Sequence, residues 1–257
     1  MAETVRNIKL VIEYDGTGFS GWQRLSPAPS GAGQRRGRSI QGDIEQAIRA
    51  VTRQKVNITG AGRTDAGVHA LGQVANFKFE HRLPVASIPA ALNAHLPEEI
   101  RIVGADEVGN DFHARYSATG RTYRYAVLNR PSPSAILRHR AHHVPPPLNV
   151  EAMSAALAIL RGRHAFTAFR AVGSSERTTV CDLRRAEVAR SGEMVIFTFE
   201  ADRFLRHMVR LIVGTLLKVG QGKLTANGVA EILAGEDNQR AGPRAPAHGL
   251  YLVKVDY

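Results

Sequence analysis

One carboxylate stands among glycines in the sequence GAGRTDAGVHA, which runs from Gly60 to Ala70. Glycine is favoured where the backbone takes a positive φ or comes close to another group, so three glycines predict a loop shaped around something. Asp65 lies inside this loop, and Arg63 stands two residues before it. An arginine at that spacing can hold the aspartate ionised, which suits a carboxylate that acts as a nucleophile or as a general base.

The common glycine-rich motifs do not fit this sequence. A dinucleotide-binding fingerprint needs a glycine where Asp65 stands and a helix after the loop, whereas a strand is expected here. A P-loop needs Lys followed by Ser or Thr after its last glycine, but Gly67 is followed by Val68 and His69. The plain alternative is a tight turn in which Asp65 hydrogen-bonds its own backbone, and the local pattern leaves this alternative open.

Two strands are expected to position the loop. Val56 and Ile58 alternate with polar residues before it, and Ala75, Phe77 and Phe79 do so after it. The pattern therefore places Asp65 between two strands.

The rest of the chain predicts the element order β-α-β-β-α-β twice. The other elements of the first pass are a strand at 8–14, a helix capped by Ser39, a short helix at 87–92 and a strand at 100–108. Those of the second are strands at 121–127, 178–189, 194–201 and 250–257, and helices at 151–161, at 204–219 and after Thr225. Two ferredoxin-like halves of the α+β class, joined near residues 106–118, are the simplest interpretation.

Composition points to a polyanionic partner. The chain of 257 residues has 34 Lys and Arg against 23 Asp and Glu, a net charge of +11, and 28 of the basic residues are arginine. Arginine offers paired donors to phosphate and a plane that stacks on bases, which favours a folded nucleic acid over a membrane surface. A genome rich in G and C is the other explanation of this bias.

The sequence has no apolar run of 18 residues and no signal-peptide core at its start, so a soluble, cytoplasmic protein is predicted. Cys181 is the only cysteine, which excludes an internal disulfide and a multi-cysteine zinc site. Since it falls in an alternating strand, a buried structural thiol is expected there.

The sequence GRTDAGVHA resembles the active-site motif of the tRNA pseudouridine synthase A family. Other matching strings cover nearly the whole chain: YDGT at 14–17, GWQ at 21–23, DFHAR at 111–115, RTYRY at 121–125, MVR and IVG within 208–214, and GLYL at 249–252. Two departures, Leu25 where the family usually has glutamine and a longer segment at 26–38, lie outside the loop.

The resemblance implies a pseudouridine synthase fold with two ferredoxin-like halves, at residues 1–110 and 111–257. Their sheets would join into one continuous, mostly antiparallel sheet with a central basic cleft. It implies an isomerase that converts uridine to pseudouridine at positions 38, 39 and 40 in the anticodon stem-loop of tRNA. It further implies a homodimer that needs neither a metal nor a cofactor.

The resemblance also assigns roles to five residues. Asp65 would be the catalytic nucleophile or base, supported by Arg63 and Arg210, while Tyr123 would stack on the target base and Leu250 would pack against it. From the residue pattern alone, a place in the core is expected for both Tyr123 and Leu250.

A basic helix face and a histidine cluster are weaker candidates. Arg203, Arg206, His207 and Arg210 would share one face of the helix at 204–219, which by pattern alone is a solvated face. The sequence RHRAHH at 138–143 contains no cysteine or carboxylate, so zinc is not favoured and a phosphate-facing or merely solvated loop is expected.

The segment from Ser26 to Arg38 is rich in Pro, Gly and Ser. It predicts a mobile loop whose Arg35, Arg36 and Arg38 clamp phosphate, and a solvated insertion is the alternative.

Two rivals to the enzyme remain. A non-catalytic RNA-binding platform would explain the charge but not the aspartate among glycines. A metal-dependent nuclease would need paired carboxylates, and the acid nearest to Asp65 along the chain is Glu80, well along the following strand.

Overall fold

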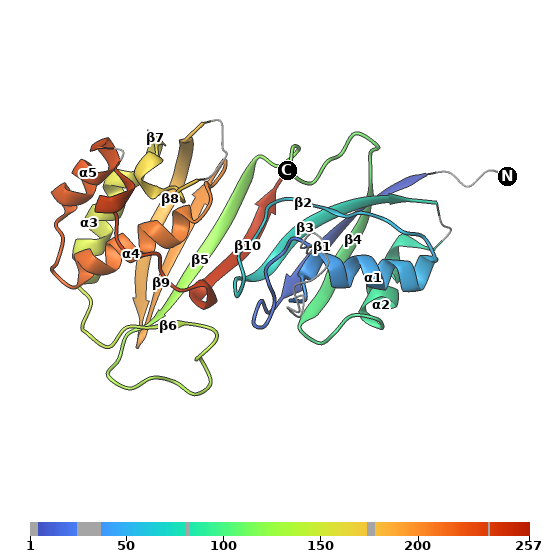
Figure 1. The fold of residues 1–257 in the computed structure, drawn as a ribbon, viewed down its shortest axis with the longest axis horizontal. Coiled ribbons are helices and arrows are strands. Elements are labelled where there is room, and N and C mark those ends of the chain that lie inside the picture. Colours follow the sequence, from blue (N-terminus) through green and yellow to red (C-terminus); the bar gives the residue numbers. More distant parts are fainter. Residues whose placement is uncertain (1–4, 25–36, 81–82, 174–177, 236) are drawn as a thin grey trace, which may run out of the picture. The chain divides into compact units, whose positions relative to one another are not determined.

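The computed structural model describes residues 5–24, 37–80, 83–173, 178–235 and 237–257 (Figure 1). The chain forms two compact units: residues up to 118 together with 252–257, and residues 119–251. The predicted boundary after residue 110 therefore differs from the observed division.

Hydrogen bonds explain why residues 111–118 belong to the first unit. The Asn7 side-chain amide donates to the Phe112 carbonyl over 3.0 Å, and the Ala114 amide donates to Asn76 Oδ1 over 2.9 Å. The end of the chain returns to the same segment, because the Tyr257 hydroxyl donates to the Ala114 carbonyl over 2.8 Å.

The first unit has the predicted order β-α-β-β-α-β. Its elements are β1 (Arg6–Tyr14), α1 (Ile40–Thr52), β2 (Thr59–Gly60), β3 (His69–Phe79), the short 3₁₀ turn η1 (Val85–Ser87), α2 (Ile88–Asn93) and β4 (Ile100–Val108). β1 pairs antiparallel with both β3 and β4, and β2 pairs antiparallel with β3. The alternation of β1 turns Ile8, Leu10 and Ile12 into the core, where all three are fully buried.

Helix α1 forms for the reasons that the sequence predicts. Ser39 caps it, because its Oγ accepts a hydrogen bond from the Gly42 amide over 3.2 Å. The buried face carries Ile40, Ile44 and Ile48 at helical spacing.

The second unit begins with β5 and contains most of the remaining elements. They are β5 (Gly120–Leu128), β6 (His142–His143), α3 (Val150–Leu160), β7 (Gly162–Ala165), η2 (Thr167–Phe169), β8 (Val180–Ser191), β9 (Met194–Ala201), α4 (Met208–Gly220), α5 (Ala226–Gly235), η3 (Asn238–Arg240) and η4 (Ala247–Gly249). The strand β10 (Leu250–Asp256) starts in this unit, and its residues 252–256 belong to the first.

The main strands of the second unit run in the order β5-β9-β8-β7, and each neighbouring pair is antiparallel. Helix α3 packs on β8, α4 and α5. Phe197, Phe199 and Cys181 are fully buried, so the expectation of a buried thiol is confirmed. The predicted α+β class with mostly antiparallel strands is also confirmed, while the joining of the sheets around a basic cleft stays a prediction.

One helix begins later than predicted. Helix α4 starts at Met208 rather than at residue 204, because His207 takes a left-handed conformation with φ 65° and the Met208 amide closes a turn on the Leu205 carbonyl. The prediction that Arg203 and Arg206 share a helical face with Arg210 is therefore wrong.

Most of the predicted phosphate clamp, including Arg35 and Arg36, lies outside the described residues. Arg38 is described, and its Nη2 lies 2.7 Å from Asp43 Oδ2 while its guanidinium lies 4.9 Å from the centre of the Phe19 ring. Arg38 thus has an ion-pair partner and an aromatic contact within the first unit, and its expected mobility stays a prediction. Within the described parts of the chain, none of the helices is long and apolar enough to cross a membrane.

Candidate active site

The loop that carries Asp65 connects two strands, as predicted, but the first strand is shorter and later than expected, because Val56 and Ile58 lie before β2 and outside any strand. Strand β2 ends at Gly60 and β3 begins at His69. Between them the Val68 amide donates to the Asp65 carbonyl over 3.2 Å, and Gly67 takes a φ of 78°. A residue with a side chain rarely adopts this φ, so Gly67 allows the turn directly after the half-buried Asp65.

The other two glycines of the loop differ in what they do. A Cβ atom on Gly60 would lie 2.6 Å from the Trp22 indole nitrogen, so this glycine permits close packing of the tryptophan. A Cβ on Gly62 would meet no atom within 4 Å, and its φ is not in the left-handed range. The prediction that each glycine serves a positive φ or a close approach therefore holds for Gly60 and Gly67, but not for Gly62.

Residue Thr64, directly before Asp65, is held by the segment that follows β1. Its Oγ1 lies 2.7 Å from the Tyr14 hydroxyl in the interior, and its carbonyl accepts a hydrogen bond from the Trp22 amide over 3.1 Å. The backbone of Gly21 also touches it, since a Cβ there would lie 2.6 Å from the Thr64 carbonyl oxygen. Hydrogen bonds thus hold both the side chain and the backbone of Thr64, and they fix the position of the backbone that leads into Asp65.

The other end of the loop is fixed by His69, which is 1% exposed. Its Nδ1 lies 3.1 Å from the Gly16 amide nitrogen and 2.9 Å from Asp15 Oδ1. Depending on its tautomer, the imidazole accepts from the amide or donates to the carboxylate. Pattern reasoning missed these supports of the loop, although YDGT and VHA stand among the strings that carry the family resemblance.

Arg63 is exposed and Asp65 is half-buried. Thr64 between them contacts Tyr14 in the interior. The interpretation that Arg63 orients Asp65 from two residues away stays a prediction.

Arg210 lies on α4 in the second unit and is only 8% exposed. Its Nε donates to the Ala245 carbonyl over 2.7 Å, and the Ala245 amide donates back to the Arg210 carbonyl over 3.0 Å. The solvated face that the pattern alone predicts is therefore wrong for Arg210. The reciprocal bonds fix the arginine to the segment that leads into η4 and Leu250.

The two tyrosines of β5 have different surroundings. Tyr125 is fully buried and donates from its hydroxyl to the Pro246 carbonyl over 2.8 Å, and burial raises the pKa of this phenol. Tyr123 is half-buried and meets the Phe204 ring edge to face at 5.0 Å between centroids. Leu250, the first residue of β10, is 7% exposed. Of the two tyrosines, Tyr123 is the one with ring surface left for a ligand.

The five predicted site residues divide between the two units. Asp65 and Arg63 belong to the first unit, and Tyr123, Arg210 and Leu250 belong to the second.

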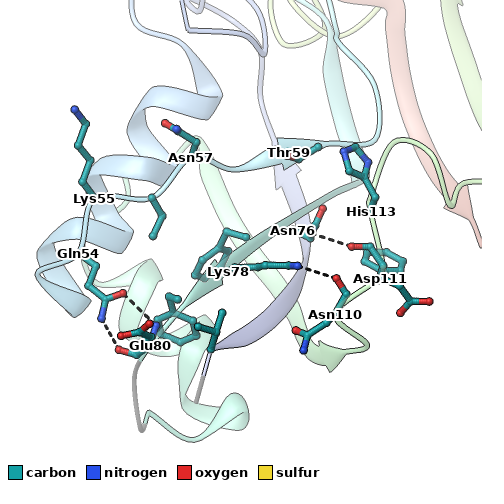
Figure 2. Close-up of a pocket in the computed structure, with 15 residues that line it drawn as sticks. Gln54, Lys55, Asn57, Thr59, Asn76, Lys78, Glu80, Asn110, Asp111 and His113 are labelled. Carbon is teal, nitrogen blue, oxygen red and sulfur yellow. Dashed lines mark hydrogen bonds between the residues drawn. The ribbon is translucent and has the colours of Figure 1, made fainter. Parts of the chain in front are cut away.

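A polar groove of about 870 Å³ lies elsewhere on the first unit, along β3 and the segment 110–113 (Figure 2). It includes none of the five predicted residues. Its polar groups bond mainly to one another: Lys78 donates to the Asn110 carbonyl over 2.8 Å, and the Glu80 amide donates to the Gln54 side chain over 3.2 Å. We therefore regard the groove as a seam between β3 and this segment rather than as the place of the chemistry.

Comparison with known proteins identifies the family. The family profile described as "tRNA pseudouridine synthase" matches residues 10–117 and 156–257. Relatives called tRNA pseudouridine synthase A in Acetivibrio thermocellus and Thermoanaerobacter sp. are 46% and 42% identical, and one called tRNA pseudouridine synthase A 2 in Clostridium perfringens is 44% identical. Each alignment covers 98% of this chain and 100% of the relative.

This α+β chain is thus similar over nearly its whole length to proteins named tRNA pseudouridine synthase A. The chain belongs to the tRNA pseudouridine synthase family.

Proposed function

We propose that this protein isomerises uridine to pseudouridine at positions 38, 39 and 40 in the anticodon stem-loop of tRNA. The observation that carries the proposal is the position of Asp65, a carboxylate on a loop held through Thr64 on one side and His69 on the other, in a chain of this family. A non-catalytic RNA-binding platform is not favoured, because it gives no reason to fix one carboxylate in this way.

The reaction needs a carboxylate close to the ribose. The bond between C1′ and N1 of the uracil breaks, the base turns, and a bond forms between C1′ and C5. The C5 hydrogen leaves as a proton, and N1 gains a hydrogen. Ionised Asp65 either attacks C1′ as a nucleophile or removes the C2′ proton as a base, and both routes return the carboxylate at the end.

The other four residues are proposed to hold the substrate and the carboxylate. Arg210 pairs with Asp65, Tyr123 stacks on the uracil, and Leu250 packs against it. The target lies in or beside a stem and must be flipped out before it can react, which costs a few kcal/mol, and the exposed Arg63 is suited to fill the space that it leaves. The half-buried ring of Tyr123 supports its part in this proposal.

We further propose that the protein acts as a homodimer in the cytoplasm and that it uses no metal or cofactor. The net charge of +11 supports tRNA as the partner, because affinity for nucleic acid rests largely on contacts with phosphate.

Release of tritium from tRNA that carries C5-labelled uridine tests the function directly. Three substrates, each with one uridine left among positions 38, 39 and 40, report on each position separately. We expect release from all three. Binding of these tRNAs without any release would contradict the enzyme and favour the binding platform, and sedimentation of the free protein tests the dimer.

A further inference from the structure

The segment 129–143, here called the histidine loop, follows β5 and ends with the two residues of β6. It has no part in the function proposed above. It contains three arginines (130, 138 and 140) and three histidines (139, 142 and 143) but no acidic residue. Arg138 and Arg140 are exposed, and so is Ile136, at 86%. This charge pattern favours an anionic ligand.

The histidine loop is exposed but held in one conformation. Arg130 Nε donates to the Ser132 carbonyl over 2.8 Å, and the His143 ring nitrogen Nε2 lies 2.9 Å from the Arg130 carbonyl. The Leu137 amide donates to Ser134 Oγ over 3.1 Å. A surface loop built in this way presents its side chains with little ordering cost on binding.

The loop covers a cavity of about 310 Å³ within the second unit. The lining is apolar at Leu128, Pro133, Leu137 and Ala141, and polar at Ser134, Arg138, His142, His143 and His248. This volume is at the lower end of the range for ligand pockets, which suits one small planar group.

One nitrogen of His142 in this cavity is buried and unpaired: Nδ1 makes no hydrogen bond to any residue that the structure describes. The ring meets Tyr125 and His248 edge to face, at 6.3 and 6.4 Å between centroids. Burial, aided by His248 and His143, lowers the pKa of His142 to about 4, so the imidazole is neutral near pH 7. Buried polar groups are nearly always hydrogen-bonded, so an unsatisfied nitrogen at a cavity indicates that a bound ligand supplies its hydrogen-bond partner.

One residue that lines the cavity, His248, is near in sequence to Leu250 of the proposed site. His248 stands two residues before Leu250, and the Tyr251 hydroxyl donates to the Arg140 carbonyl over 2.7 Å. A ligand in the cavity would therefore lie near a uracil packed on Leu250.

We propose that the cavity under the histidine loop binds an unpaired nucleobase of the substrate RNA that neighbours the target uridine. The base packs on Leu137 and hydrogen-bonds to His142 through its edge, and Arg138 and Arg140 face its phosphates. This inference rests on the proposed function. Unpaired bases are commonly held by such stacking and edge contacts, and a neutral imidazole can donate or accept, so the cavity tolerates any base.

The test measures how a variant with a filled cavity binds RNAs that each lack one base. Leu137→Trp places an indole in the cavity, and Ile136→Trp is the matched control, because Ile136 lies on the same loop and is exposed. Affinity is measured for anticodon stem-loops with cytidine in place of the target uridine, so that no turnover occurs. Each unpaired position is made abasic in turn.

For the wild type and Ile136→Trp, we expect one abasic position to weaken binding about tenfold, in the range for loss of one stacked base. Leu137→Trp should bind the intact RNA about tenfold more weakly, and the same abasic position should then have no further effect. The inference is wrong if no abasic position matters, or if Leu137→Trp discriminates against it as the wild type does.

Two further measurements keep the result clear. His142→Phe keeps a ring and removes both nitrogens, so it should reduce the same discrimination even if Leu137→Trp does not fold. Conversion of a dimer to a monomer by Leu137→Trp, but not by Ile136→Trp, would assign the cavity to a subunit contact and overturn the inference. Tritium release is recorded separately on uridine RNA, so a wild type that shows this discrimination but releases no tritium contradicts only the proposed function.

Discussion

At the scale of single residues, Thr64 connects the buried part of the first unit to Asp65. Its hydroxyl meets Tyr14 and its carbonyl meets the Trp22 amide, while Asp65 itself stays half-buried. The backbone of Asp65 is therefore held in place by the residue that precedes it.

Tyr123→Phe should retain most of the affinity for tRNA, whereas Tyr123→Ala should lose it by roughly 1–3 kcal/mol, because only the phenyl ring keeps a face for stacking. Equilibrium binding of tRNA by the two variants measures this difference. Equal losses in both would contradict stacking by the ring, and loss of turnover in the Phe variant with binding retained would indicate a role of the hydroxyl.

His142 should make stability depend on pH. Because burial lowers its pKa in the folded state to about 4, the unfolded chain binds more protons in the interval below the ordinary value of 6.5. The free energy of unfolding should therefore fall as pH decreases from about 6.5 to 4. His142→Phe should show a smaller decrease when denaturant unfolding is followed across this range, and parallel profiles would contradict the burial of a neutral imidazole.

At the scale of elements, the loop depends on the segment between β1 and α1. Gly21 and Gly18 allow backbone strain to be separated from steric contact with the loop, because both have a positive φ, of 99° and 79° respectively. A Cβ on Gly21 would lie 2.6 Å from the Thr64 carbonyl oxygen, whereas one on Gly18 would meet nothing within 4 Å.

Gly18→Ala should therefore cost only the strain of a left-handed alanine, roughly 1–2 kcal/mol. Gly21→Ala should cost more and also lower kcat, because the added methyl displaces Thr64 and with it Asp65. Thermal unfolding and single-turnover rates measure the two effects. If Gly21→Ala turns over as fast as Gly18→Ala, the position of Thr64 does not control the chemistry.

Regular elements with a clear cap or alternation could be predicted from the sequence. Helix α1 follows from Ser39 and its apolar stripe, and β1 follows from strict alternation. The late start of α4 could not, because the left-handed His207 depends on tertiary contacts such as the one between its ring and Arg244 Nη1, at 3.0 Å. Strand β6 is only two residues long, too short for any periodic signal.

Less of the candidate site than of the regular elements could be predicted from local pattern. Local pattern placed Asp65 in a loop between strands, but only the family resemblance singled out Arg210, Tyr123 and Leu250. Sequence spacing also suggests that Arg63 orients Asp65, which stays a prediction, since Arg63 is exposed and Asp65 is half-buried on either side of the buried Thr64.

At the scale of the whole molecule, the proposed chemistry draws on both units, since Asp65 belongs to one and Arg210 to the other. Because the proposed reaction needs a carboxylate and no metal, activity on tRNA should survive exhaustive treatment with EDTA. Tritium release before and after chelation checks this, with refolded tRNA as the control for loss of bound magnesium from the substrate. Loss of activity that zinc or magnesium restores to the enzyme would contradict the metal-free proposal.

The most direct test of the account is the single-turnover rate of Asp65→Asn at saturating tRNA. The substitution keeps the shape of the side chain and removes its charge, so the rate should fall by at least about 100-fold while the Kd for tRNA changes little. Asp106→Asn, at a surface acid that pairs with Lys9, is the matched control and should react like the wild type. A rate for Asp65→Asn above about a few per cent of the wild type would contradict the central claim that this carboxylate carries the reaction.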